Sequence, residues 1–218
     1  MRIPLPPTSP GLRVGLFGGS FNPPHEGHRL VAETALRRLG LDQVWWIVTP
    51  GNPLKSNSTL PSQAERAGLV RDLVGPDRRM VVSGIEARIG TRYTEQTIRF
   101  LRSRLPQVHF VWLMGADNLA DFHRWKNWEN IAGLVPMAII DRPGSTLKAV
   151  SSPAARMLAR FRIDESDARL LARLPAPRWL FLHGRRSPLS STALREKARE
   201  MRRARCLLAC AGSRLRKT

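Results

Sequence analysis

The sequence contains only two cysteines in 218 residues, Cys206 and Cys210. A small secreted domain held together by disulfides would carry more of them, so that class of protein is excluded. In a reducing compartment, two cysteines four positions apart are small apolar residues on one helix face. A zinc site would need two further good ligands, and His183 is the one histidine that follows residue 123. We therefore expect no metal site in this chain.

The sequence also lacks an apolar run long enough to cross a membrane. The best candidate, residues 131–140, is short and is interrupted by Gly133 and Pro136. Residues 1–7 do not have the apolar centre of a signal peptide. We therefore expect a cytoplasmic protein without a membrane partner. A chain of this length with 42% hydrophobic residues can fill the core of one α/β domain.

Acidic residues are few, since 17 Asp and Glu stand against 36 Lys and Arg, which gives a net charge of +19. Such an excess is found in proteins that bind nucleic acid or anionic membrane surfaces. Lysine, however, occurs only five times, and arginine in place of lysine is also what a GC-rich genome produces. Part of the excess lies in residues 202–217. We interpret the charge as a solvated surface that suits polyanionic small molecules, and keep a nucleic-acid-binding protein as the alternative from a different class.

Apolar segments alternate with amphipathic ones along the chain. We expect strands at residues 12–17, 44–48, 80–82, 108–113, 134–140 and 179–182. We expect helices at residues 25–39, 62–74, 94–104, 152–174 and 193–201. In the fourth helix the expected buried face is Ala154, Leu158, Phe161, Leu170 and Leu171. This alternation predicts an α/β fold with a doubly wound parallel sheet. We expect an irregular extension at residues 1–10, a single domain at residues 11–201 and a basic tail at residues 202–218.

A glycine-rich turn, Gly18-Gly19-Ser20-Phe21-Asn22-Pro23-Pro24-His25-Glu26-Gly27-His28, joins the first expected strand to the first expected helix. It lacks the Gly-x-Gly-x-x-Gly of dinucleotide-binding dehydrogenases and the Gly-Lys-Ser/Thr of phosphate-loop hydrolases. It has two histidines at positions 25 and 28, on one side of a helix N-terminus where N–H groups already favour an anion. Two imidazoles there can stabilise the charge on a phosphoryl group during transfer. A metal pair and two surface histidines are the alternatives.

A second motif, Leu189-Ser190-Ser191-Thr192-Ala193-Leu194-Arg195, follows the last expected strand. Hydroxyls at a helix start can cap the helix and can bind a phosphate. Arg195 lies one turn further on, and its planar guanidinium suits two oxygens of a phosphate or pyrophosphate. An ordinary helix cap with a surface arginine is the alternative. Both motifs follow strand ends, which is where open parallel sheets bind ligands.

These two motifs resemble the signatures of the nucleotidyltransferase superfamily with a His-x-Gly-His motif, whose fold is Rossmann-like. Three segments between them are similar to bacterial nicotinate-nucleotide adenylyltransferases. They are Arg92-Tyr93-Thr94-Glu95-Gln96-Thr97, Gly115-Ala116-Asp117-Asn118-Leu119 followed by Trp125, and Asp141-Arg142-Pro143-Gly144. The resemblance runs in order from about residue 13 to residue 196.

The resemblance implies adenylyl transfer from ATP to nicotinate mononucleotide, which gives nicotinate-adenine dinucleotide and pyrophosphate in NAD biosynthesis. The catalytic residues would be His25, His28 and Arg195. The residues that would bind ATP are Gly18, Gly19, Ser20, Phe21, His25, His28, Gly115, Asp117, Ser190, Ser191, Thr192 and Arg195. Mg²⁺ would arrive on the phosphates of ATP, with no metal site of the protein's own.

For the second substrate, the resemblance implies a site formed by Asn52, Lys55, Thr94, Trp125, Lys126 and Arg142. An aromatic face can stack on a flat nicotinate ring, and N–H groups near Trp125 and Lys126 can bind its carboxylate. A core position is the alternative for Trp125. The loop after residue 48 departs from the family, because Gly51-Asn52-Pro53-Leu54-Lys55 stands where Pro-Pro-His-Lys is common.

The same active-site motifs would serve an adenylyltransferase that acts on nicotinamide mononucleotide or phosphopantetheine. Tyr93, Thr94 and Trp125 favour the nicotinate nucleotide. The oligomeric state and the role of the basic tail do not follow from the sequence.

Overall fold

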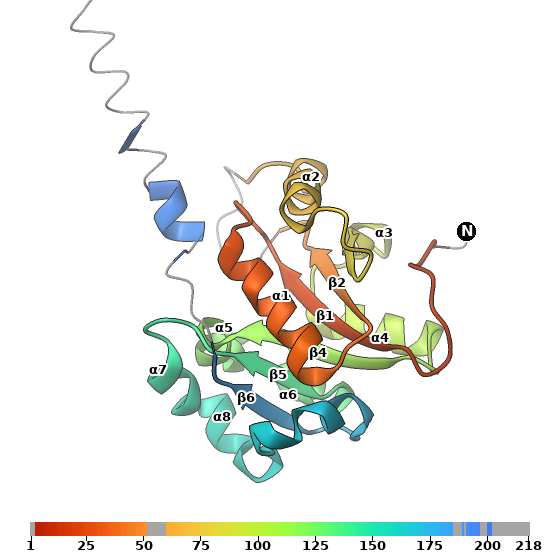
Figure 1. Cartoon of the computed structure of the whole chain (residues 1–218), viewed down its shortest axis with the longest axis vertical. Coiled ribbons are helices and arrows are strands. Elements are labelled where there is room, and N and C mark those ends of the chain that lie inside the picture. The colour runs from red at the N-terminus through yellow and green to blue at the C-terminus, as the bar shows by residue number, and fades with distance from the viewer. Residues whose placement is uncertain (1–2, 52–59, 185–188, 190, 197–199, 202–218) are drawn as a thin grey trace, which may run out of the picture.

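The computed structural model describes residues 3–51, 60–184, 189, 191–196 and 200–201. Among these residues, six parallel strands form one sheet in the order β3-β2-β1-β4-β5-β6 (Figure 1). The strands are β1 (Arg13–Gly19), β2 (Gln43–Val48), β3 (Met80–Ser83), β4 (His109–Gly115), β5 (Met137–Ile140) and β6 (Trp179–Leu182). The order confirms the predicted doubly wound sheet, and the direction of winding changes between β1 and β4.

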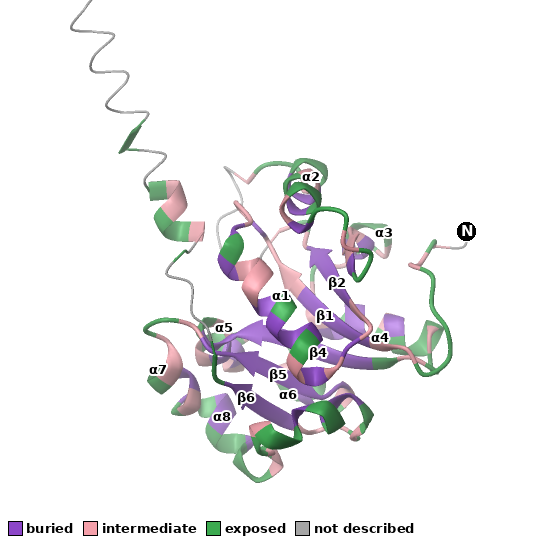
Figure 2. Cartoon of the chain, in the orientation of Figure 1, coloured by how far each residue is buried: buried purple, intermediate pink, exposed green. Residues whose placement is uncertain are grey.

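Helical segments cover both faces of the sheet. They are α1 (Glu26–Leu39), α2 (Gln63–Val74), α3 (Ile85–Arg88), α4 (Thr94–Arg104), α5 (Ala116–Asp121), η1 (Phe122–Arg124), α6 (Trp128–Leu134), α7 (Thr146–Val150), α8 (Pro153–Met157), η2 (Ala159–Phe161) and η3 (Glu165–Arg173). Trp45 and Trp46, neighbours in β2, belong to different core clusters because successive strand residues point to opposite faces. Helices α1, α2 and η3 pack on the Trp46 face, and α4, α5, α6 and α8 pack on the Trp45 face. The strands are accordingly buried while the outer helix faces are exposed (Figure 2).

The first two helices begin and end where their sequences predict. Helix α1 starts after its cap residue His25 and ends at Gly40, which has a φ of 62° and donates its N–H to the Leu36 carbonyl. Helix α2 starts after Ser62, whose hydroxyl accepts from the Glu65 N–H at 3.2 Å. The Glu65 carboxylate accepts in return from the Ser62 N–H at 2.8 Å. This reciprocal cap confirms the expected helix start at residue 62.

The prediction of one helix over residues 152–174 is wrong. The segment divides into α8, η2 and η3, because Ile163 donates its N–H to the Trp179 carbonyl at 2.9 Å and so joins the edge of the sheet. Asp164 then caps the next helix, its carboxylate accepting from the Ser166 N–H at 2.8 Å. Leu170, expected to be buried, is 53% exposed. The three-residue repeat of a 3₁₀ helix turns Ala168 and Leu171 inward instead.

The expected strand at residues 134–140 is also shorter than predicted. Residues 128–134 form α6, and the strand begins at Met137, directly after Pro136. The short helix α3 was not predicted. Residues 3–10 form neither helix nor strand, although Ile3 and Leu5 pack against the core. Within the described part of the chain, no helix is long and apolar enough to span a membrane.

Candidate active site

The candidate site lies where β1 and β4, which are neighbours in the sheet, both end. The glycine-rich turn follows β1, and Gly115 is the last residue of β4. A Cβ atom placed on Gly18 would lie 2.5 Å from the Trp112 ring, so this position has no room for a side chain. The turn can therefore pass close to β4 only because residue 18 is glycine.

Phe21 holds the turn in place from inside the protein. Its φ of 47° is uncommon for a residue with a side chain, and only 2% of its surface is exposed. Its ring contacts Phe17, His28 and Trp46, with centroid distances of 5.5, 5.2 and 5.3 Å. These contacts stabilise the unfavourable backbone conformation and orient the His28 imidazole.

Two backbone N–H groups fix the ring nitrogens of the histidine pair. The Gly27 N–H donates to His25 Nδ1 at 3.1 Å, and the His25 N–H donates to His28 Nδ1 at 3.3 Å. Because Nδ1 accepts in both rings, a neutral imidazole must carry its proton on Nε2. His25 Nε2 is buried and has no hydrogen-bond partner among the described residues. Both neutral histidines therefore carry an Nε2–H donor, and their ring centroids lie 3.9 Å apart.

Burial keeps both histidines neutral. It lowers the pKa of His25 to about 4, with a further lowering from the Arg142 charge and a small opposing effect of Asp117. It lowers the pKa of His28 to about 2, assisted by the Arg142 charge and by His25 once that residue is protonated at low pH. At neutral pH both imidazoles are therefore neutral and can donate an N–H to an anion, and an anion bound there would raise both pKa values.

Gly115, Asp117 and Arg142 form the neighbouring wall of the site. Arg142 Nη1 lies 3.4 Å from Asp117 Oδ2, and the arginine side chain is 18% exposed. A Cβ on Gly115 would lie 2.4 Å from Asp117 Oδ1 and 3.0 Å from Arg142 Cδ, so a larger residue there would displace these two side chains. Arg142 was expected at the acceptor site. Arg142 pairs with Asp117 and lies beside Gly115, two residues expected to bind ATP, and its place at the acceptor site stays a prediction.

The second motif lies directly on the first. Residues 191–196 are helical. The Ser191 hydroxyl donates to the Pro23 carbonyl at 2.9 Å, across 168 positions of sequence. Arg195 donates from Nη1 to the Asn22 carbonyl and from Nη2 to the Thr192 hydroxyl. The structure therefore brings the two motifs together, as expected from their positions after strand ends. Ser190 lies outside the described residues.

The expected acceptor residues lie around the start of α4 and the segment after η1. Thr94 is the first residue of α4, and Lys126 Nζ lies 4.4 Å from the centre of the Tyr93 ring. The Trp125 ring makes edge contacts with Phe122 at 5.5 Å and Trp112 at 6.3 Å, and the residue is partly exposed. One side of Trp125 therefore packs on the core and the residue still reaches the surface. Asn52 and Lys55 lie outside the described residues.

Arg66 is a buried residue beside the site that the sequence analysis missed. It is 0% exposed, and it donates to the carbonyls of Ser20, Thr49, Pro50 and Pro61. Burial lowers the pKa of its guanidinium, although arginine stays charged in proteins. A signal was present, because Arg66 occupies the same helix face as Val70 and Val74, at spacings of four residues.

Glu86, on α3, is a second buried ionisable residue that sequence reasoning did not find. Its Oε1 accepts from the Thr97 hydroxyl at 3.0 Å, and its Oε2 is buried without a hydrogen-bond partner among the described residues. Burial raises the pKa of this carboxyl. A glutamate beside the apolar Ile85 in an unpredicted four-residue helix gives no signal of burial in the sequence.

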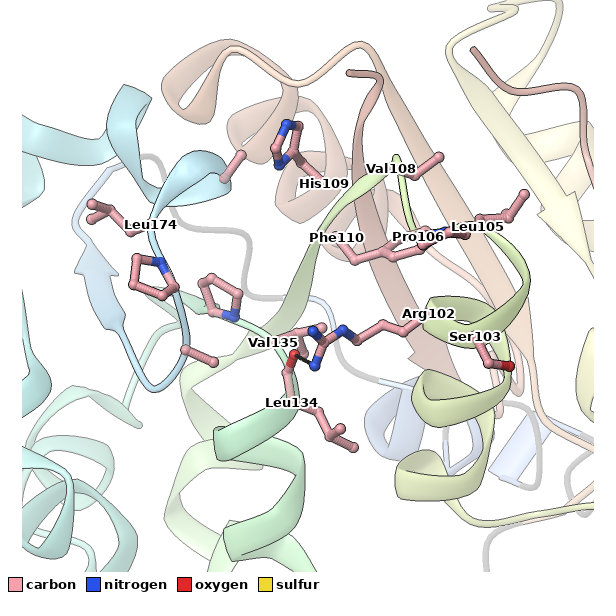
Figure 3. A pocket seen from close by; sticks show the side chains of 14 residues that line it. Arg102, Ser103, Leu105, Pro106, Val108, His109, Phe110, Leu134, Val135 and Leu174 are labelled. Atoms are coloured by element: carbon pink, nitrogen blue, oxygen red, sulfur yellow. Dashed lines mark hydrogen bonds between the residues drawn. The ribbon is translucent and has the colours of Figure 1, made fainter. Parts of the chain in front are cut away.

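A hollow of about 390 Å³ lies at the opposite edge of the sheet, around the amino ends of β4 and β5 (Figure 3). Pro106, Phe110 and Leu174 are among its lining residues. Arg102 reaches along it to the Leu134 carbonyl at 2.7 Å. None of the predicted site residues lines this hollow.

The Rossmann-like sheet carries a glycine-rich histidine turn at the change of winding, bonded to a second, hydroxyl-rich helix start, and this is where open α/β sheets bind ligands. The arrangement is that of the nucleotidyltransferase class. Residues 16–197 match the family described as Cytidylyltransferase-like. The chain belongs to this family, and the resemblance drawn from the motifs is confirmed.

Several known sequences and solved structures are similar to this chain. A probable nicotinate-nucleotide adenylyltransferase of Rhizobium etli is 56% identical over 185 residues, which are 85% of this chain and 96% of that protein. The protein of the same name from Agrobacterium fabrum is 57% identical over 182 residues, 84% of this chain and 97% of that protein. The structure of Plasmodium falciparum nicotinic acid mononucleotide adenylyltransferase complexed with NaAD superposes with a TM-score of 0.63. The matched region is 85% of this chain and 83% of the Plasmodium protein, at 17% sequence identity, so the likeness supports the fold.

Proposed function

We propose that the protein is a nicotinate-nucleotide adenylyltransferase, which converts ATP and nicotinate mononucleotide to nicotinate-adenine dinucleotide and pyrophosphate. The observation that carries the proposal is the histidine pair, whose Nε2–H donors are fixed by backbone N–H groups at the N-terminus of α1. The names of relatives at 56% and 57% identity support the choice of substrates.

The reaction needs no covalent intermediate with the enzyme. An oxygen of the 5′-phosphate of nicotinate mononucleotide attacks the α-phosphorus of ATP, and the bond from that phosphorus to the bridging oxygen breaks. The electron pair leaves with pyrophosphate. A phosphate dianion is already a nucleophile, so the protein's task is to position the groups and stabilise charge.

His25 and His28 would donate to the ATP phosphates and to the charge that develops during transfer. Arg195 would hold the leaving pyrophosphate with its N–H groups that are not bonded to Asn22 and Thr192, and Ser191 would support it. Gly115 and Asp117 would contact the adenosine. Mg²⁺ would enter on the ATP phosphates, as part of the substrate.

Trp125, Thr94 and Lys126 would bind the nicotinate nucleotide. Lys126, held over Tyr93, would contribute a positive charge near the nicotinate carboxylate. Nicotinamide lacks this carboxylate, so a site adapted to the anion would leave its donors unpaired with nicotinamide mononucleotide.

Pyrophosphate release tests the proposal. The purified protein is incubated with ATP, Mg²⁺ and one of three acceptors: nicotinate mononucleotide, nicotinamide mononucleotide or phosphopantetheine. We expect release with the nicotinate nucleotide and much slower release with the others. No release with any acceptor would contradict the adenylyltransferase assignment. Equal rates with the two mononucleotides would contradict the acceptor preference alone.

A further inference from the structure

Arg66 bonds to both of the loops that would hold the two substrates. Its Nη1 donates to the Ser20 carbonyl at 2.7 Å, in the glycine-rich turn. Its Nη2 donates to the Thr49 and Pro50 carbonyls, at 2.8 and 3.3 Å, in the loop after β2. Its Nε donates to the Pro61 carbonyl at 2.9 Å, just before α2. One guanidinium thus joins three separate segments.

The partners of Arg66 are unusual for a fully buried cation. Its four hydrogen-bond partners in the described part of the chain are backbone carbonyls, and none of the ion pairs there includes Arg66. A buried charge without a counter-ion is costly in free energy. The positive charge is nevertheless placed beside a site expected to bind two phosphate-bearing substrates, where it is compensated when they bind.

Hydrogen bonds to these carbonyls also fix the direction of two N–H groups. In a trans peptide the carbonyl and the N–H point in opposite directions. The peptides Ser20–Phe21 and Pro50–Gly51 are not among the cis bonds of the described chain. Because their carbonyls point at Arg66, the Phe21 and Gly51 N–H groups point away from it. A carbonyl bonded to a cation also makes the N–H of the same peptide a better donor.

The turn and the loop are already coupled by their backbones, since the Thr49 N–H donates to the Gly19 carbonyl at 3.0 Å. Gln63, one turn before Arg66 in α2, donates to the Val48 carbonyl at the end of β2. Two side chains of helix α2, those of Gln63 and Arg66, therefore bond to the end of β2 and the loop after it. Of these two, Arg66 also bonds to the glycine-rich turn.

We propose that Arg66 is a positioning residue, which ties the phosphate-binding turn to the loop after β2 and directs the Phe21 and Gly51 N–H groups toward the two anionic substrates. The inference rests on the proposed function for the identity of those substrates. It assigns Arg66 no contact with either of them.

Arg66→Lys tests the proposal, because it keeps the charge but replaces the planar fork with one nitrogen that cannot reach three segments. We expect a folded protein in which KM rises for both ATP and nicotinate mononucleotide, and kcat/KM falls on the order of 100-fold, as for a displacement of about 1 Å. Arg102→Lys is the matched control. Arg102 also donates to a backbone carbonyl, that of Leu134, but at the opposite edge of the sheet (Figure 3), so its kinetic constants should match the wild type.

Three outcomes would overturn the inference. The first is a folded Arg66→Lys protein with wild-type KM values for both substrates, even if its melting temperature has dropped. The second is a change in KM for only one substrate. The third is a variant that stays unfolded with both substrates at saturation, since Arg66 would then serve folding alone. A variant that folds only when the substrates are added would support the inference.

Turnover by the wild-type protein tests the proposed function, whereas the Arg66 inference can also be tested without turnover. Without turnover by the wild type, the proposed function fails while the Arg66 inference is still measurable. Binding of α,β-methylene-ATP by calorimetry needs no turnover. A dissociation constant raised about tenfold or more in Arg66→Lys but not in Arg102→Lys would support a positioning role at the phosphate turn. Equal constants in all three proteins would overturn it.

Discussion

Buried or bonded arginines have opposite effects at the two ends of the parallel strands, which are called here the amino edge and the carboxyl edge of the sheet. At the amino edge, Arg102 donates to the carbonyl of Leu134, the last residue of α6, where the helix dipole is negative. At the carboxyl edge, Arg66 donates to carbonyls of loops that turn their N–H groups the other way. The first contact neutralises a helix end, whereas the second leaves a positive environment. Two arginines that both bond to carbonyls therefore have different effects, because the carbonyls belong to a helix end in one case and to loops in the other.

His28→Ala should have the largest effect on activity. It tests whether the carboxyl edge, and not the amino edge, carries the chemistry. Removing one Nε2–H donor from the charge that develops in transfer should lower kcat by about 100-fold to 1,000-fold. Pyrophosphate release under saturating substrates measures it, and circular dichroism checks the fold. The control is His109→Ala, an exposed histidine at the amino edge. A near-normal rate for His28→Ala would show that the histidine pair is structural.

Arg195→Lys should have the next largest effect. The lysine loses the fork that bonds Asn22 and Thr192, and it can no longer offer two parallel donors to pyrophosphate. We expect kcat/KM for ATP to fall by about 10-fold to 100-fold, the value of a charge-assisted hydrogen bond. Initial rates against ATP concentration measure it. An unchanged kcat/KM would leave Arg195 as a surface residue that caps the turn.

Gly18→Ala should destabilise the site edge of the sheet. Its Cβ would lie 2.5 Å from the Trp112 ring, so the variant should lose about 1–3 kcal/mol of unfolding free energy in a denaturant titration. Gly68→Ala is the matched control, because a Cβ there, inside α2, meets nothing within 4 Å. It should gain about 0.5–1 kcal/mol from helix propensity. Two equal changes would contradict the close packing at Gly18.

The pH dependence of stability tests the burial of the histidine pair without any measurement of activity. Burial lowers the pKa of His25 to about 4 and that of His28 to about 2, while both titrate near about 6.5 when unfolded. The unfolded chain therefore binds more protons below pH ~6.5, and each histidine removes up to about 1.4 kcal/mol of stability per pH unit as the pH falls. Their contribution is complete above pH ~6.5.

A variant with both histidines changed to asparagine isolates this effect. Glu86 contributes with the opposite sign, because its pKa is raised and the folded protein binds its proton first. Comparing the variant with the wild type between pH 7 and pH 5 removes the Glu86 contribution. Equal slopes of unfolding free energy against pH would show that His25 and His28 are not buried as neutral groups.

Local patterns predicted most of the sheet and the meeting of the two motifs at its carboxyl end. Strand β6 and helix α4 begin and end at the predicted residues, because apolar runs and helix periodicity are properties of the local sequence. The contact between residues 191–195 and the glycine-rich turn was also predicted from the sequence, because both segments come after parallel strands.

Tertiary contacts decided what the sequence analysis missed. The break at residues 162–164 depends on a hydrogen bond to Trp179, which no local propensity encodes. Arg66 was overlooked because an arginine in a helix is ordinarily a surface residue. Its burial is compensated by carbonyls of Ser20, Thr49 and Pro50, which only the folded chain brings within reach.

The contact of Arg195 with Asn22 has a consequence for synthesis of the chain. A chain that ended before residue 189 would contain all six strands and the complete histidine turn, yet it would lack Ser191 and Arg195. During translation, the six strands can therefore assemble into the sheet before the two motifs have met. Such a fragment should retain the sheet but not the activity, so activity reports that the last part of the domain has been made and has docked.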